Sequence, residues 1–126
     1  TVSFHAPFAE IAEKFVATRI NYIYVLAGER FLGAVSLHDI KNYLNSPDLA
    51  ALVIAGDILR DGFPFLRPDA TLNEALENFS RHEGERLPVV SPSEGGKLLG
   101  SIAKTDIILA LAGSTNRSAT TVGKAE

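Results

Sequence analysis

The chain has 126 residues, of which 46% are hydrophobic, and this is enough for one compact domain with a substantial core. Its formal net charge is −3 and it contains no run of Lys or Arg, so nucleic acid is not expected as a partner. The absence of cysteine excludes a disulfide framework and any cysteine-based metal site or nucleophile. No apolar run approaches the roughly 20 residues that cross a membrane, so we expect a soluble piece.

The first half of the chain is expected to fold as strand, helix, strand, turn, strand and helix. The leading strand is 2–4, and the helix is 8–15, where apolar residues recur at helical spacing. An apolar strand follows at 22–26 and then a turn at 27–30. The segment 31–44, FLGAVSLHDIKNYL, supplies the last strand and helix of this half.

The next stretch, 48–59, reads DLAALVIAGDIL and is more apolar than an exposed linker should be. Asp48 is expected to cap a helix here. This helix would lie against the body of the protein and join the two halves.

The second half repeats the first. Residues 98–111, LLGSIAKTDIILAL, share five of fourteen positions with 31–44, at an offset of 67 residues. The helical pattern of 8–15 recurs at 72–79, with Thr71 as its expected N-cap and Glu74 as the capping-box residue. A leading strand is predicted at 63–66 and a second at 87–90. The glycines and lysine at 95–97 favour a hairpin turn over a phosphate loop, because no Walker spacing surrounds them.

The repeat predicts an α/β (α+β) fold of two β-α-β-β-α units that pack on each other as one globule. The interface between such units is the first place to look for a site. The expected division is a first unit at 1–47, a connecting helix at 48–60, a second unit at 61–112 and a polar mobile tail at 113–126. Because the leading strand begins at once, we expect this chain to be a piece of a longer protein.

A motif lies at the junction of the last strand and last helix of each half. In each copy an Asp follows a Gly by six positions: the first copy runs from Gly33 through Ser36 to Asp39, and the second from Gly100 through Ala103 to Asp106. With these flanking elements, residues 2–112 resemble the tandem CBS domain, also called the Bateman module. The hallmark of that family is Gly, hydrophobic residues, Ser or Thr, two variable positions and Asp, so the second copy lacks the motif hydroxyl. The segments 33–44, 48–59 and 85–90 are also similar to the cytoplasmic C-terminal tail of bacterial CLC-type chloride channels and transporters.

The resemblance implies two clefts that bind adenine nucleotides such as ATP, ADP or AMP. In the family the motif Asp accepts hydrogen bonds from the ribose hydroxyls, and the Ser or Thr position and the helix N-terminus face phosphate. The first implied cleft combines Ser36, Asp39, Phe63, Phe65, Arg86 and Pro88. The second combines Lys104, Thr105, Asp106, Ser3, Asn21 and Tyr22. The first cleft is favoured, because the second lacks the motif hydroxyl.

Several of these residues also have a purely structural interpretation. Asp39 and Asp106 lie where helices begin, and a carboxylate there stabilises a helix without any ligand. Arg86 is placed to pair with Glu83 or Glu85 at the surface. Tyr22 and Tyr24 share one face of a strand, where packing between subunits competes with stacking on adenine.

Two classes of function are expected. The first is implied by the resemblance: a nucleotide sensor that regulates the transmembrane part of a chloride channel or transporter, as a cytoplasmic domain at the inner (plasma) membrane. The second is a ligand-free assembly module, in which the apolar helices at 49–59 and 107–111 form a homodimer surface. A different parent, such as another ion transporter or a metabolic enzyme, remains an alternative. No catalytic arrangement emerges, so an enzyme is not expected, and the three histidines are scattered without metal-ligand spacing.

Overall fold

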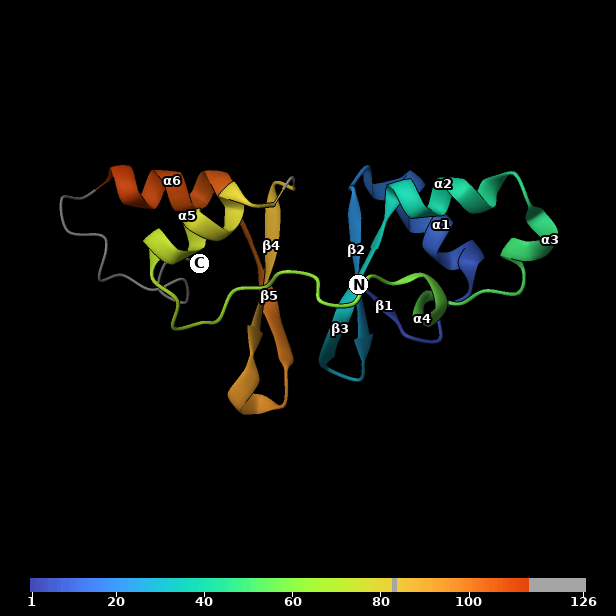
Figure 1. The fold of residues 1–126 in the computed structure, drawn as a ribbon, viewed down its shortest axis with the longest axis horizontal. Coiled ribbons are helices and arrows are strands. Elements are labelled where there is room, and N and C mark those ends of the chain that lie inside the picture. The colour runs from blue at the N-terminus through green and yellow to red at the C-terminus, as the bar shows by residue number, and fades with distance from the viewer. Residues whose placement is uncertain (83, 114–126) are drawn as a thin grey trace. The chain divides into compact units, whose positions relative to one another are not determined.

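The computed structural model describes residues 1–82 and 84–113, and the chain divides into two compact units between Phe63 and Pro64. In each unit the longer helices lie on one side of the strands (Figure 1). The predicted tail lies outside the described residues except for Gly113. No helix in the described part of the chain is both long and apolar enough to cross a membrane.

The first unit follows the predicted order of elements. Strand β1 is parallel to β2, and β2 is antiparallel to β3, with Val25 opposite Gly33. Helix α1 is longer than predicted, and its C-cap residue, Arg19, has a left-handed backbone. The elements of the unit are β1 (Val2–Ser3), α1 (Phe8–Thr18), β2 (Tyr22–Ala27), β3 (Arg30–Ser36), α2 (Leu37–Leu44), α3 (Pro47–Ala50) and α4 (Ala55–Ile58).

The predicted connecting helix at 48–59 is wrong. The structure has two single-turn helices instead, α3 and α4, and Asp48 lies in the first turn of α3 while Ser46 holds the N-cap position. The reason is a set of hydrogen bonds at the start of α4, two of which join it to residues outside the segment. The N–H groups of Ala55 and Gly56 donate to backbone oxygens of the loop after β1, each at 2.9 Å, and the Ile54 N–H donates to the Asp57 carboxylate at 2.9 Å. These contacts anchor α4 on the first unit and prevent one continuous helix.

The second unit contains a hairpin and its two helices. Its elements are α5 (Leu72–Ser80), β4 (Arg86–Ser91), the 3-10 turn η1 (Pro92–Glu94), β5 (Lys97–Ala103) and α6 (Lys104–Ala112). The predicted leading strand at 63–66 is wrong, because only Leu66 pairs with β4, opposite Val89. Its N–H donates to the Pro88 carbonyl and its carbonyl accepts from the Val90 N–H, both at 2.8 Å. Prolines at 64 and 68 have no N–H to extend this ladder.

The two units match residue by residue in their strands. Val25 pairs with Gly33 in one unit and Val89 with Gly100 in the other, and both hairpins shift register at the next residue. The hairpin turn predicted at 95–97 is confirmed, with positive φ at Gly95 and Gly96. The hairpin turn of the second unit is longer. For this reason the two motifs are further apart in the sequence than the first helices of the two units are.

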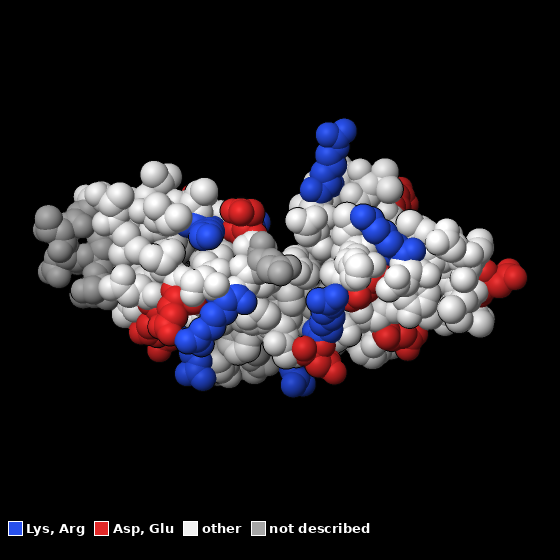
Figure 2. All heavy atoms as spheres, turned by 45° about the horizontal axis from the view of Figure 1, so that its top comes forward, with Lys and Arg blue, Asp and Glu red and all other residues white. Residues whose placement is uncertain are grey.

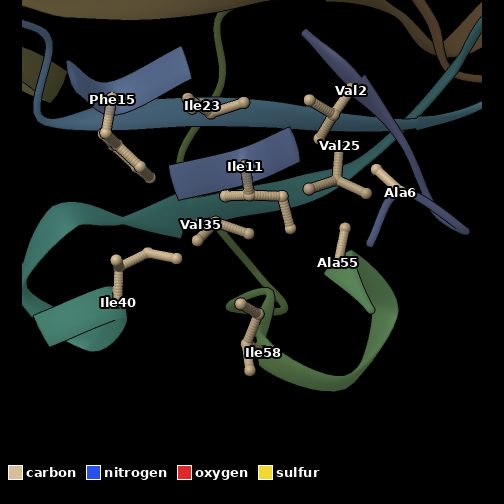
Figure 3. Close-up of a cluster of buried hydrophobic side chains, with 10 residues drawn as sticks. All are labelled: Val2, Ala6, Ile11, Phe15, Ile23, Val25, Val35, Ile40, Ala55 and Ile58. Carbon is tan, nitrogen blue, oxygen red and sulfur yellow. The ribbon is translucent and has the colours of Figure 1, made fainter. Parts of the chain in front are cut away.

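Each unit has its own hydrophobic core. In the first unit, side chains of α1, α2 and α4 point toward those of the strands (Figure 3). The core of the second unit is formed by Leu66, Leu72, Ala75, Phe79, Leu87, Val89, Ile102 and Ile107. Burial of each large side chain contributes about 1.5–3 kcal/mol, so each unit depends chiefly on its own core.

The helices that follow the motif differ in their caps. The Ser36 hydroxyl accepts from the Asp39 N–H at 3.0 Å at the start of α2. At the start of α6, Ala103 has no side chain that can cap, although its φ of −86° and ψ of 145° are close to the −94° and 148° of Ser36. The predicted cap of α5 is confirmed, since Thr71 accepts from the Glu74 N–H at 3.1 Å.

The uncapped start of α6 leads to a prediction. We expect Ala103→Ser to raise the free energy of unfolding by about 0.5–1 kcal/mol, because the backbone already has the geometry that a capping serine needs. Ser36→Ala should lower it by about 1 kcal/mol. Urea unfolding followed by circular dichroism measures both. A serine at 103 that fails to stabilise the protein would contradict the equivalence of the two helix starts.

Candidate functional site

The candidate site is centred on Asp39, the third residue of α2. Strand β3 ends at Ser36, and the helix begins at once, so the carboxylate is carried on the first helical turn. The Leu37 N–H donates to the Asn21 carbonyl at 2.9 Å, which ties the start of α2 to the residue before β2. The Asp39 side chain keeps 25% of its surface exposed. A fixed and accessible carboxylate therefore lies at a helix N-terminus.

Arg60 forms a two-pronged ion pair with Asp39. Its Nε lies 2.8 Å from Oδ2 and its Nη2 lies 3.1 Å from Oδ1. The hydrogen bond from Arg60 lowers the pKa of Asp39, against an opposing effect of burial and with smaller help from the Ser36 hydroxyl. Because the folded-state pKa is lowered, the pair stabilises the fold at neutral pH, and this contribution is lost as pH falls through that value. The sequence did not indicate this pair.

The motif glycine determines where Arg60 lies. The Arg60 N–H donates to the Ala34 carbonyl of β3 at 2.8 Å, so the chain runs directly over the strand at Gly33. A Cβ atom at Gly33 would lie only 2.3 Å from the Arg60 carbonyl oxygen. Glycine at this position therefore allows the close approach that brings the guanidinium to Asp39.

Aromatic rings from β2, β3 and the end of the first unit pack together. Tyr22 and Tyr24 point to one face of β2, as predicted, while Ile23 is buried in the core between them. The Phe63 ring centroid is 5.0 Å from that of Tyr22 and 6.3 Å from that of Tyr24. Phe31 packs on Tyr24 at 5.8 Å. The two tyrosines thus pack on other rings of the same unit, and the predicted packing between subunits stays a prediction. Neither Tyr24 nor Phe31 was among the predicted ligand residues.

This aromatic cluster (Tyr22, Tyr24, Phe31 and Phe63) adjoins the Asp39–Arg60 pair. Tyr22 lies opposite Ser36 in the ladder of β2 and β3. The pKa of Arg60 is raised, first by its hydrogen bond to Asp39 and then by the Asp39 charge, with a smaller contribution from Tyr22. A carboxylate, a cation and aromatic surface are therefore close together within one unit.

The predicted residues of the first unit are only partly brought together. Ser36, Asp39 and Phe63 belong to the first implied set, and Asn21 and Tyr22, from the second, lie beside them. Ser3 pairs with Leu26, toward the far end of β2 from Tyr22. The two predicted ligand sets, each drawn from both units, remain predictions.

In the second unit, Arg86 makes a contact that the sequence did not indicate. Its Nε donates to the Ser101 hydroxyl at 2.9 Å and its Nη2 to the Ser101 carbonyl at 3.3 Å, across the hairpin. Among the described residues Arg86 does not form the expected pair with Glu85, and Glu83 lies outside them. Phe65 precedes the Leu66 bridge, Pro88 lies in β4, and Lys104, Thr105 and Asp106 form the first turn of α6. Lys104 donates its backbone N–H to the Glu85 carbonyl at 2.8 Å, as Leu37 does to Asn21.

The second unit has an open hollow of about 840 Å³. It contains none of the predicted ligand residues and is lined by Arg67, Pro68, Asp69, Ser91, Pro92, Ser93, Glu94 and Leu99.

The charged side chains form no continuous basic stripe on the face shown in Figure 2, where basic side chains are scattered among acidic ones. Within the described ranges, no three His, Cys, Asp or Glu side chains are grouped so as to hold a metal ion.

Two matching units, each with a Gly-to-Asp motif between its last strand and last helix, define a CBS pair, or Bateman module. The CBS-domain family matches residues 1–46 and 55–113, and the chain belongs to this family. The predicted tandem CBS fold is therefore confirmed.

Comparison with curated proteins finds an uncharacterised relative, MJ1232 of Methanocaldococcus jannaschii. It is 24% identical over 113 residues, which cover 90% of this chain and 36% of that protein. The chain thus spans little more than a third of the length of this relative.

Several solved structures share the fold. CBSX2 from Arabidopsis thaliana has a TM-score of 0.72 and 20% identity, covering 90% of this chain and 86% of that one; CBSX2 has also been solved in complex with AMP. The cytosolic domain of the Mg²⁺ channel MgtE, in complex with ATP, has a TM-score of 0.68 and 22% identity, covering 86% of this chain and 43% of that one. CbpB in complex with c-di-AMP has a TM-score of 0.73 and 15% identity, covering 90% and 77%.

Proposed function

We propose that this chain is a regulatory CBS pair that binds an adenine nucleotide, with Asp39 as the ribose-binding residue. The observation that carries the proposal is the position of the Asp39 carboxylate, which is accessible and fixed at the start of α2 beside the aromatic cluster. The complexes of CBSX2 with AMP, of MgtE with ATP and of CbpB with c-di-AMP support this ligand class.

The chemistry of the site suits a nucleotide. The lowered pKa keeps Asp39 ionised at neutral pH, so its two oxygens accept hydrogen bonds from the vicinal ribose hydroxyls. The positive end of the α2 dipole and the Arg60 guanidinium favour an anionic phosphate nearby. In this proposal Phe65, Arg86 and Pro88 complete the ligand set, and the set around Asp106 forms a second site that lacks the motif hydroxyl.

For the parent protein, we propose an ion transporter or channel whose cytoplasmic part includes this module. The similarity of 33–44, 48–59 and 85–90 to CLC-type tails supports a chloride channel or transporter, and the likeness to MgtE supports a Mg²⁺ channel equally well. In either parent, the nucleotide regulates only through a difference in its affinity for two arrangements of the module.

A ligand-free assembly module is the second candidate. Large apolar side chains are exposed on the short helix region and on α6, with Leu52 exposed by 78%, Leu109 by 70% and Leu49 by 52%. These residues belong to the two segments predicted to form a homodimer surface. Such a surface accords with either function, because a sensor can also dimerise.

Isothermal titration with AMP, ADP and ATP tests the proposal. We expect saturable binding by the wild-type chain and a loss of affinity of about 10- to 100-fold in Asp39→Asn, which removes the charge but keeps the shape. The matched variant Asp106→Asn, at the same position of α6, should retain most of the affinity. Binding lost only in Asp106→Asn would move the site to the second unit. No binding at all, by a chain that light scattering shows to be a dimer, would favour the assembly module.

A further inference from the structure

We propose that Arg60 is a built-in competitor for the ribose hydroxyls, which holds Asp39 in the unliganded protein and is displaced when a nucleoside binds. This inference rests on the proposed nucleotide site and adds a mode of regulation to it. It assigns a role to a residue outside the CBS motif.

The contact geometry makes the two occupants of Asp39 exclusive. Arg60 presents two parallel N–H donors, one to each carboxylate oxygen, at 2.8 and 3.1 Å. Vicinal ribose hydroxyls present two O–H donors with a similar spacing and need the same edge of the carboxylate. The lone pairs that Arg60 leaves free point away from each other on opposite sides of the group, so one diol cannot bridge them. A bidentate ribose therefore requires the guanidinium to leave.

Arg60 is able to leave because its backbone and its side chain are held differently. The backbone is fixed on β3 through the hydrogen bond to Ala34, whereas 49% of the side-chain surface is exposed. The guanidinium can therefore move into water while the chain stays in place. Its displacement should reduce the apparent affinity of a ligand only modestly, because exposed ion pairs are weak.

Release of the Arg60 side chain would affect the segment that follows it in the chain. Arg60 directly precedes the three residues that lead into the second unit, and the last of them, Phe63, belongs to the aromatic cluster. Gly62 in this segment has a φ of 66°, a conformation that bends the chain. An occupied ribose site thus frees the side chain at the start of the connection between the units.

Titration with adenosine tests this proposal, because adenosine has the ribose but no phosphate charge. We expect Arg60→Gln to bind adenosine about twofold to fivefold more tightly than the wild type, since the competitor is removed. The matched control is Arg81→Gln, which removes the comparable 2.8 Å pair with Glu77 on α5 and should leave the affinity unchanged. Unchanged or weaker binding in Arg60→Gln, together with the expected loss in Asp39→Asn, would overturn the competitor while leaving the proposed function intact. If neither adenosine nor AMP binds to the wild type or to any variant, the proposed function fails and the competitor with it.

A second measurement follows Arg60 itself. In the wild type, the NMR signal of the Arg60 Nε–H should shift toward that of a solvent-exposed arginine when adenosine is saturating. The Asp39 pKa, followed by carboxyl ¹³C shifts without ligand, should rise in Arg60→Gln, which confirms that the ion pair exists in solution. An Arg60 signal that does not move on adenosine binding would overturn the proposal whatever the affinities are.

Discussion

Phe79→Ala is expected to lower the free energy of unfolding by about 3–5 kcal/mol, which is the usual cost of truncating a buried phenylalanine. Phe79 is only 1% exposed and belongs to the core of the second unit. Single domains are stable by about 5–15 kcal/mol, so this loss should leave the second unit marginally folded or unfolded. Urea unfolding measured by circular dichroism gives the size of the effect.

A phenylalanine of the same unit provides the control for Phe79. Phe65 is 41% exposed, so Phe65→Ala should cost much less than Phe79→Ala. If the two substitutions cost the same, the second unit would not depend on the core described here. Because the first unit has a separate core, we also expect its amide protons to remain protected from exchange in Phe79→Ala.

Gly33→Ala is expected to lower the free energy of unfolding by about 1–3 kcal/mol and to loosen the pair between Arg60 and Asp39. The added Cβ would lie 2.3 Å from a backbone oxygen of Arg60, which cannot rotate away as a side chain would. Strand β3 and the segment that contains Arg60 must then move apart. The Asp39 pKa, measured by NMR, should rise toward its ordinary value as Arg60 withdraws.

Gly28→Ala separates this clash from backbone strain. Gly28 has a φ of 64°, and a Cβ there would meet no atom within 4 Å. Its substitution should cost about 1 kcal/mol through the left-handed backbone alone and leave the Asp39 pKa low. An equally low Asp39 pKa in Gly33→Ala would contradict the role of the glycine in placing Arg60.

The sequence predicted the repeated elements well, for local reasons. Helices α1 and α5 each have an apolar face at helical spacing, and the Thr71 cap of α5 is encoded within four residues. The prediction of one connecting helix was wrong because hydrogen bonds to the loop after β1 fix the start of α4. No local sequence pattern reveals these contacts. The leading strand at 63–66 was wrong because isolated apolar residues between prolines resemble a strand in composition only.

Of the candidate site, the residues of the motif could be predicted from the sequence. Ser36 and Asp39 are neighbours at a strand–helix junction, and their spacing alone predicts the cap that the structure contains. Arg60 follows Asp39 by 21 residues and reaches it because the chain returns over Gly33. Its backbone partner, Ala34, lies in a different element, so the pairing is a property of tertiary packing that the sequence pattern does not carry.

The unequal hairpins have a practical consequence. Ala27 and Arg30 are paired across the shorter turn, and Ser91 and Lys97 are paired across the longer one, yet the strand pairs that follow are equivalent in both units. The fold thus already accommodates extra residues at this turn without a change in the strands that carry the motif. Because the chain has no cysteine, a fluorophore attached to the thiol of Ser93→Cys, in the exposed longer turn, should report on the second unit without disturbing the start of α2 or α6.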